Sequence, residues 1–298
     1  VACAINWFSA SSVFSLVASD LSLNVAWLGL ITSAFILGVG LFQLPAGLVA
    51  AKQGPKRALM YGVFLTSTAS VLSGFVDQLP LLAVLRFIVG LGEAFIFGPG
   101  AVLISRYFRK GSEGLSLGLF GGAFDFGGIV GILGWAILGS MIGWRMSLVL
   151  GGAIGLVAGL LLLTMVPSDP LKDAFFIRFS DLRKVLLNKW LLLISSGLLT
   201  VQVGFNLSGY FMVYYLEDNL GVSADLAGVI GSLTLAASVV ASPLAGRAFD
   251  RIPSPKRAFI ISGLVAGAGL AIASLGSIHA AFFSTLVVGA STGAGFAI

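Results

Sequence analysis

The stretch GLVAAKQGPKRA at residues 47–58 returns as GRAFDRIPSPKRA at residues 246–258. The glycines that open the two copies lie 199 residues apart, and the Lys-Arg-Ala that closes each copy is offset by 200. The offset of 199 also pairs residues 21–29 with residues 220–228 upstream. A repeat of this length, carried by apolar segments, is typical of a duplicated membrane bundle. We call the two stretches the first and the second basic hinge, and we expect them to be the matching loops of two halves.

Composition excludes a mainly water-facing protein. Hydrophobic residues make up 58% of the chain and charged residues only 10%, whereas a soluble domain carries about 25% charged residues. The chain opens inside an apolar segment, so we expect its natural start to lie upstream. Apolar runs predict an all-α membrane protein whose spans lie at roughly 1–19, 25–50, 57–76, 80–105, 114–140, 144–166, 189–216, 224–248, 257–276 and 279–298.

The net charge of +5 follows membrane topology and does not indicate a nucleic-acid surface. All but two of the 17 basic residues, Arg86 and Arg145, fall in alternate loops. Because basic loops face the cytoplasm, we expect a multi-pass protein of a prokaryotic plasma membrane with a cytoplasmic N-terminus. The opposite loops carry acidic residues instead, namely Asp20, Asp77, Glu217, Asp218 and Asp225.

Several classes of chemistry are disfavoured by what the chain contains. Its single cysteine, Cys3, excludes an internal disulfide and a multi-thiol metal site. Its single histidine, His279, argues against a His-based metal centre, and we expect neither metal nor cofactor. A membrane-embedded enzyme would need a catalytic cluster, which is not evident here. A receptor or a channel would not need duplicated halves.

The fourth span holds two of the charges that membrane segments rarely contain. Arg86, Gly90 and Glu93 are spaced i, i+4 and i+7, so they share one helical face. A charge in a span costs at least about 2.5 kcal/mol on insertion scales, so it normally faces a cavity or a partner. The alternative is a purely structural ion pair, and the general expectation for charged residues in spans favours a functional role over it.

The fifth span places another carboxylate, Asp125, in a glycine-rich segment that otherwise indicates close helix packing. Asp125 and Glu93 both fall near the expected midplane. Apolar surroundings disfavour a charged carboxylate, whereas a nearby Arg86 would favour it. A proton-coupled site could use this competition. The remaining polar candidates at mid-depth, Asn6, Gln202 and Asn206, suit either hydrogen bonding to a solute or helix packing.

Together these motifs resemble the major facilitator superfamily of secondary transporters. Residues 47–57 are similar to its cytoplasmic loop signature and residues 246–257 to the second-half echo. Residues 86–92 are similar to its fourth-span motif, whose arginine the family associates with proton or anion handling. Further matches are the fifth-span glycines Gly118, Gly127 and Gly131, the Arg106-Tyr-Phe stretch and Gly143-Trp144-Arg145.

The resemblance implies two pseudo-symmetric bundles of six helices, the second of them truncated in this chain, and a monomer. The expected divisions are an N-terminal bundle over 1–166, a cytoplasmic linker over 167–188 and a C-terminal bundle over 189–298. The implied activity is alternating-access transport of a small solute. The implied gating loops contain Gly47, Lys52, Gly54, Arg57, Arg106, Gly246, Asp250, Arg251 and Arg257.

Departures from the family pattern shape the functional hypothesis. Ile132 stands where the fifth-span antiporter motif has proline, and Glu93 where the fourth-span motif has a small residue. We favour proton coupling through Glu93 or Asp125 and a small solute bound by Arg86, for which an organic or inorganic anion is one candidate class. A drug or metabolite efflux antiporter is the alternative, which Ile132 weakens.

The two hinges differ at the position of the family's latch aspartate. In family members this aspartate holds the halves together on the cytoplasmic side and favours the outward-facing state. The first hinge has Ala51 there, along with Pro55 in place of arginine, whereas the second hinge keeps Asp250, with Pro253 in place of glycine. Pseudo-symmetry predicts that Asp250 binds the helix N-terminus near residues 112–114, where free N–H groups attract an anion.

Overall fold

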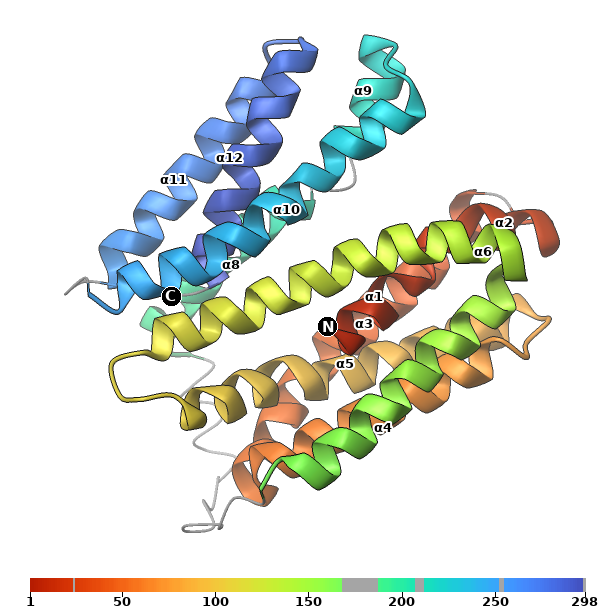
Figure 1. Ribbon diagram of the computed structural model, residues 1–298, viewed down its shortest axis with the longest axis horizontal. Coiled ribbons are helices and arrows are strands. Elements are labelled where there is room, and N and C mark those ends of the chain that lie inside the picture. Colours follow the sequence, from red (N-terminus) through yellow and green to blue (C-terminus); the bar gives the residue numbers. More distant parts are fainter. Residues whose placement is uncertain (24, 168–186, 207–211, 252–254, 297–298) are drawn as a thin grey trace. The chain divides into compact units, whose positions relative to one another are not determined.

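The computed structural model describes residues 1–298 except 24, 168–186, 207–211, 252–254 and 297–298 (Figure 1). The described residues form helices and no strands. The linker expected at 167–188 lies almost entirely outside the described residues. The elements are α1 (Ala2–Ser9), the 3₁₀ turn η1 (Ser11–Val13), α2 (Phe14–Asp20), α3 (Val25–Gln53), α4 (Pro55–Ser73), α5 (Leu79–Tyr107), α6 (Glu113–Met165), α8 (Lys189–Asn206), α9 (Met212–Leu220), α10 (Ala224–Phe249), α11 (Pro255–Ala273) and α12 (Ile278–Phe296).

The helices coincide with the apolar runs of the sequence. Within the described residues, six helical stretches are long and apolar enough to cross a membrane. The chain is therefore an all-α, multi-pass membrane protein, as its composition predicted. The six stretches are Trp27–Gln53, Leu79–Tyr107, Glu113–Trp135, Ile137–Met165, Leu226–Phe249 and Ile278–Gly295.

Glycine and proline set the turns between helices. The first basic hinge turns at Gly54, whose φ of 91° is a conformation that residues with a Cβ rarely adopt. Pro55 then begins α4, where its missing N–H costs no helical hydrogen bond. The long element α6 contains two helices that meet at Gly143, where φ is 80° and ψ is 161°. These two helices are the fifth and sixth spans expected from the sequence.

The chain divides into two compact units, and the division does not follow the sequence halves. Unit 1 contains the described residues of 1–103 and 127–176, and unit 2 contains those of 104–126 and 177–298. The first part of α6, residues 113–126, therefore packs with the helices of the second half. The boundaries at 166 and 189 suggested by the repeat stay a prediction.

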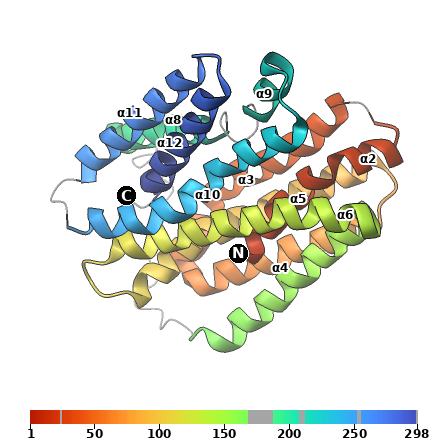
Figure 2. The same cartoon turned by 45° about the horizontal axis from the view of Figure 1, so that its top comes forward.

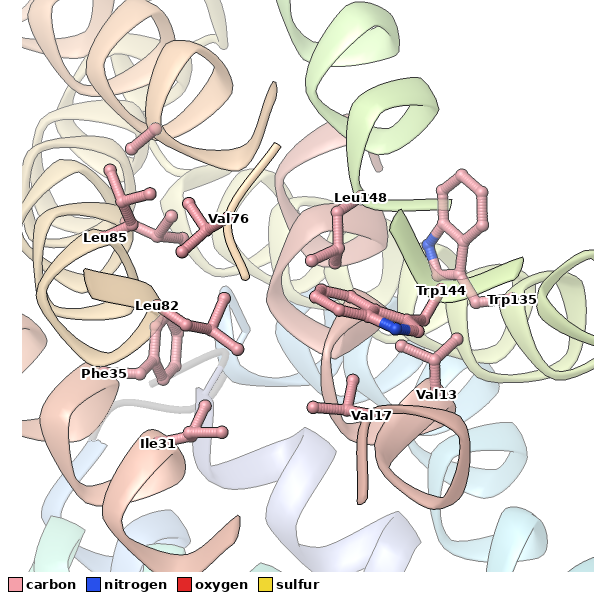
Figure 3. Packing of buried hydrophobic residues seen from close by; sticks show 12 residues of the cluster. Val13, Val17, Ile31, Phe35, Val76, Leu82, Leu85, Trp135, Trp144 and Leu148 are labelled. Atoms are coloured by element: carbon pink, nitrogen blue, oxygen red, sulfur yellow. The ribbon is translucent and has the colours of Figure 1, made fainter. Parts of the chain in front are cut away.

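The largest apolar cluster of unit 1 forms around Trp144, which begins the second helix of α6 (Figure 3). The Trp144 ring lies between Leu148 on its own helix and Val17 of α2. Leu82 and Leu85 bring α5 into the same cluster. The cluster therefore packs α5 together with α2, α3 and α6.

Glycine contacts hold α5 close to α3 and to α4 in unit 1. A Cβ added to Gly90 would lie 2.0 Å from the carbonyl oxygen of Phe35 on α3. A Cβ added to Gly92 would lie 2.3 Å from Oγ1 of Thr66 on α4. At both positions a Cβ would also meet backbone atoms of the facing helix, so only glycine permits these approaches.

Unit 2 uses the same kind of contact between α10 and α12. A Cβ added to Gly289 on α12 would lie 2.2 Å from the carbonyl oxygen of Thr234 on α10. Figures 1 and 2 both draw residues 113–126, the yellow start of α6, beside the cyan α10. In this unit α10 is therefore covered by α12 on one side and by the start of α6 on another.

Candidate functional site

Two buried charged side chains on α5 form the centre of the candidate site in unit 1. Arg86 is 2% exposed and Glu93 is 1% exposed. The Nε and Nη2 atoms of Arg86 and the Oε1 atom of Glu93 have no hydrogen-bond partner within the described part of the chain. The two side chains are also not joined to each other by an ion pair. Because they are two turns apart on one face, they can act on one bound species without neutralising each other.

Two side chains of α1, Cys3 and Asn6, add further polar groups to the site. The Cys3 thiol of α1 donates a hydrogen bond to Oε2 of Glu93. One turn along the same helix, Asn6 is 1% exposed, and its Nδ2 donates to the carbonyl oxygen of Gly151 at 3.0 Å. The Oδ1 atom of Asn6 has no partner among the described residues. One end of the amide thus anchors α1 to α6, and the other end stays available as an acceptor.

The arrangement on α5 is costly as a purely structural feature. An ionised group that is buried without a partner costs several kcal/mol, so it normally pairs, takes up a proton or binds a ligand. Arg86 offers the planar fork that binds carboxylate, sulfonate or phosphate groups through two parallel hydrogen bonds. Glu93 offers an oxygen that can accept a proton. Chemically, the site is suited to one anion and one proton.

The third buried carboxylate lies in unit 2 and has a different partner. Asp125, near the end of the first part of α6, is 3% exposed and accepts a hydrogen bond from the hydroxyl of Ser238 on α10. Ser238 is itself fully buried. Glu93 thus belongs to unit 1 and Asp125 to unit 2, so each carboxylate is described within its own unit.

The second basic hinge has the contact that the sequence predicted. The Gly114 amide donates to Oδ1 of Asp250 at 2.7 Å, and the Leu115 amide donates to Oδ2 at 3.0 Å. A carboxylate that accepts two backbone N–H groups at a helix N-terminus is favoured by both the hydrogen bonds and the helix dipole. The contact is present; its role in gating stays a prediction.

The first hinge uses its lysine instead, at the opposite end of α6. The Lys56 ammonium donates to the carbonyl oxygens of Leu163, at 3.1 Å, and Val166. These carbonyls belong to the last turn of α6 and the residue after it, where a cation is favoured by the helix dipole. Each hinge thus supplies a charge of the sign that its helix end attracts.

The structure gives no buried polar contact for the other predicted site residues whose side chains it describes. Gln202 on α8 is exposed, and Asn206 ends the same helix with a side chain that lies outside the description. The side chain of Arg257 is not described either. The remaining hinge residues are exposed, apart from the two buried glycines Gly54 and Gly246: they are Gly47, Lys52, Arg57, Arg106 and Arg251.

A further ionic cluster ties together the ends of three elements in unit 1. The Arg145 guanidinium donates to Asp20 at the end of α2 and, at 2.8 Å, to Asp77 between α4 and α5. The Trp144 indole also donates to Asp20 at 3.1 Å. The hydrogen bond from Arg145, followed by that from Trp144, holds the pKa of Asp20 below its usual value. The cluster is exposed and fastens unit 1 on the side opposite the basic hinge.

Comparison with known proteins agrees with this architecture. The sequence profile of the Major Facilitator Superfamily matches residues 1–298. The chain belongs to this superfamily. Its fold is also that of a crystal structure of the Escherichia coli fucose:proton symporter FucP, with a TM-score of 0.73, 19% identity, and coverage of 98% of this chain and 80% of that one.

Curated members of the superfamily include two informative relatives. The probable sulfoacetate transporter SauU of Cupriavidus necator is 27% identical over 254 residues, covering 80% of this chain and 59% of that protein. The probable galactarate/D-glucarate transporter GarP of Escherichia coli K12 is 31% identical over 163 residues, covering 51% of this chain and 36% of that protein. The chain thus spans about three fifths of one relative and about a third of the other. Both relatives carry transporter names, in agreement with the prediction that this superfamily member is not an enzyme.

Sequence reasoning missed three contacts that the structure shows: that of Cys3 with Glu93, that of Ser238 with Asp125, and that of Lys56 with the end of α6. The signal for Cys3 is its spacing of three from Asn6, which puts both on one helical face. Ser238 lies in a row with Thr234 and Ser242 at a spacing of four, which is a visible signal. Lys56 belongs to the first basic hinge, and nothing in the sequence indicates its contact with the end of α6.

Proposed function

We propose that this superfamily member is a proton-coupled secondary transporter that moves a small organic anion by alternating access. Arg86 binds the anionic group of the solute, and Glu93 carries the coupled proton. The single observation that carries the proposal is the pair of buried, incompletely hydrogen-bonded charges on one face of α5. A solute anion and a proton would satisfy both groups.

The relatives support an anion rather than a neutral solute. The two named above are described as probable transporters of sulfoacetate and of galactarate or D-glucarate, all of which carry carboxylate or sulfonate groups. A guanidinium binds either group through two hydrogen bonds, whereas a neutral sugar would leave the buried charge unpaired. The name of FucP as a fucose:proton symporter agrees with proton coupling on this fold.

The membrane orientation belongs to the same proposal. The basic hinges and the other basic loops face the cytoplasm, so the N-terminus is cytoplasmic. We place the protein in a prokaryotic plasma membrane as a monomer, with a proton gradient as its driving force. Asp125 is the second titratable group of the transport cycle, with a role separate from solute binding.

Transport by the full-length protein in proteoliposomes tests this function. Vesicles would be loaded at high pH and diluted into low pH with labelled sulfoacetate, galactarate or glucarate, and with fucose as the neutral comparison. We expect uptake of at least one anion above its equilibrium level, no uptake of fucose, and loss of accumulation when an uncoupler collapses the pH gradient. Anion uptake that ignores the gradient would overturn the coupling. Transport of fucose alone would overturn the solute class, and expulsion of solute under the same gradient would favour the efflux antiporter.

A further inference from the structure

The thiol of Cys3 contacts the proton-carrying residue of the proposed function from another helix. Cys3 lies in the first turn of α1 and is partly buried. One side of it packs on the apolar cluster of Leu59, Ile96 and Leu103. Its hydrogen bond within the described residues goes to Oε2 of Glu93. The thiol thus reaches Glu93 from a helix that has no charged side chain.

The two oxygens of the Glu93 carboxylate have different surroundings. Oε2 accepts the hydrogen bond from Cys3, whereas Oε1 is buried and has no partner within the described part of the chain. The whole side chain is 1% exposed, so bulk water does not make the two oxygens equivalent. A donor already occupies Oε2, and an added proton meets the free lone pairs of Oε1 first.

Contacts with α6 fix α1 on both sides of Cys3. A Cβ added to Gly127 would lie 2.6 Å from the carbonyl oxygen of Val1, and one added to Gly131 would lie 3.1 Å from Cα of Ile5. The Trp135 indole also donates to the Ile5 carbonyl at 3.0 Å. A side chain on an anchored helix can hold its partner in one orientation, as a preorganised site requires.

We propose that Cys3 is a positioning residue for Glu93, whose Oε2 it keeps as a hydrogen-bond acceptor so that the coupled proton binds at Oε1. The proposal rests on the proposed transport function, because it names the residue that orients the proton carrier of that cycle. The coupled proton comes from the aqueous phase and returns to it. The thiol keeps its own hydrogen throughout.

A thiol suits this role because it is a weak donor. A hydrogen bond to the charged form of a carboxyl group favours that form, and a weak bond does so only slightly, so Glu93 can still take up a proton. Once the proton is on Oε1, Oε2 is the carbonyl oxygen of a neutral carboxyl group and still accepts from Cys3. The contact therefore orients Glu93 in both protonation states.

Two other charged groups share this part of unit 1. Arg86 is two turns before Glu93 on the same face of α5, about 10 Å along the axis. The amino group of Val1 is two residues before Cys3 at the start of α1. Residues 127–142 of α6, which pack on α1, contain no titratable side chain. The other titratable groups of the packed elements are near helix ends or exposed, namely Lys52 on α3, Lys56, Arg57 and Tyr61 on α4, Arg106 and Tyr107 on α5, and Asp20, Asp77 and Arg145 in the exposed ionic cluster.

Infrared spectroscopy of the full-length protein tests the contact without knowledge of the solute. The S–H stretching band lies apart from other protein bands, and Cys3→Ser identifies the part of it that belongs to Cys3. We expect the Cys3 band to move to higher frequency as the pH is lowered and Glu93 is protonated, because a bond to a neutral acceptor is weaker. In Glu93→Gln the band should stay at the position of a neutral acceptor at every pH.

Uptake of labelled sulfoacetate, galactarate or glucarate by proteoliposomes measures the consequence for coupling. In Cys3→Ala the ionised carboxylate loses its donor, so the pH of half-maximal uptake should move upward by about half a unit, about a threefold change in proton affinity. The KM for the anion and exchange at equal pH should stay unchanged, because Arg86 is intact. Cys3→Ser keeps a donor of similar size and should restore the pH profile.

The matched control is Ser12→Ala in the same span. The Ser12 hydroxyl donates to the carbonyl oxygen of Phe8, so this variant also loses a small donor but none that reaches a carboxylate. Its infrared band for Cys3 and its pH profile of uptake should both equal those of the unaltered protein.

A Cys3 band that is the same in Glu93→Gln as in the unaltered protein would overturn the proposal. An unchanged pH profile in Cys3→Ala would also overturn it, as would an equal loss of uptake and exchange, which is the result expected if Cys3 only fills space. If Cys3→Ala does not fold, the infrared comparison still decides. Failure of the proposed function is seen separately, since the Cys3 band would still respond to pH and to Glu93→Gln while none of the anions is taken up with protons.

Discussion

The fourth helices of the two sequence halves, α5 and α12, share their packing and differ in their chemistry. Gly90 of α5 approaches the carbonyl oxygen of Phe35, and Gly289 of α12 approaches that of Thr234. Both glycines and both of their partners are related by the same offset of 199 residues. The two halves therefore keep the same backbone contact at equivalent residues, although the side chains around it differ.

Of these two helices, only α5 contains Arg, Lys, Asp or Glu. The offset pairs Arg86 with Thr285 and Glu93 with Thr292. Thr285 donates to Phe282 O at 2.8 Å, and Thr292 donates to Val288 O at 2.9 Å, so both hydroxyls are satisfied within their own helix. The α5 charges keep unsatisfied atoms. The contrast teaches that packing does not require the charges, which supports a functional reason for them.

The largest expected effect is that of Glu93→Gln in the full-length protein. One coupled proton is worth about tenfold accumulation for each unit of pH gradient, and the neutral amide should lose that factor while solute exchange continues. The measurement is uptake with and without a pH gradient, next to exchange at equal pH. Thr292→Ala is the matched control on α12 and should keep the gradient response. If the Glu93→Gln variant still accumulates the solute fully, another group carries the coupled proton.

The second prediction concerns Arg86→Lys, which keeps the charge and removes the planar fork. Loss of one charge-assisted hydrogen bond, at about 1.5–3 kcal/mol, should raise the KM for the anion at least about tenfold. Initial rates of uptake over a range of solute concentration would measure it. Thr285→Ala at the equivalent position of α12 should leave KM unchanged. An unaltered KM in Arg86→Lys would mean that the solute does not contact this side chain.

The sequence predicted the membrane spans and their charged residues better than it predicted the contacts between side chains of different helices. Apolar length located the spans, and the rarity of intramembrane charge identified Arg86 and Glu93, because both signals are local. Pseudo-symmetry was enough to place Asp250 on a helix N-terminus. The bond from Cys3 to Glu93 joins residues 90 positions apart and depends on how α1 packs against α5, which no local pattern encodes. The break in the first span at Ser11–Val13 is another miss, since Ser12 donates to the Phe8 carbonyl there.

The third prediction tests the shared frame. Gly90→Ala and Gly289→Ala should each destabilise the protein, by about 1–3 kcal/mol, because the added methyl group meets backbone that cannot move alone. Thermal unfolding in detergent would compare them with Gly98→Ala, which meets nothing within 4 Å on α5. Equal stability of all three variants would show that the close approach is not important for the fold.

The fourth prediction uses the other difference between the halves, at the basic hinges. Asp250→Asn weakens two hydrogen bonds to the start of α6. A capping contact contributes about 0.5–2 kcal/mol, so the balance should move roughly 2- to 30-fold toward the inward-facing state. Labelling of a cysteine introduced on the cytoplasmic side, in a Cys3→Ser background, would report the change. Ala51→Asp, the same position in the first hinge, should move the balance the opposite way, and unchanged labelling in Asp250→Asn would exclude the latch.

The smallest expected effect concerns the exposed ionic cluster of unit 1, whose two carboxylates have no equivalent at the paired positions of the second half. At the offset of 199, Asp20 and Asp77 correspond to Asn219 and Gly276, neither of which has a carboxylate.

Hydrogen bonds from Arg145 and then Trp144 lower the pKa of Asp20, so its contribution to stability is present above its unfolded-state pKa. That contribution is lost as the pH falls through the lower folded-state pKa. Asp20→Asn should therefore lower the Tm slightly at neutral pH, and the two proteins should converge under acid conditions. The effect should be smaller than that of Gly90→Ala because solvent screens the exposed pair. The control is Asn219→Ala, whose Tm difference should not depend on pH. If the Tm difference for Asp20→Asn instead stayed constant down to acid pH, the cluster would act through packing of its side chains and not through their charge.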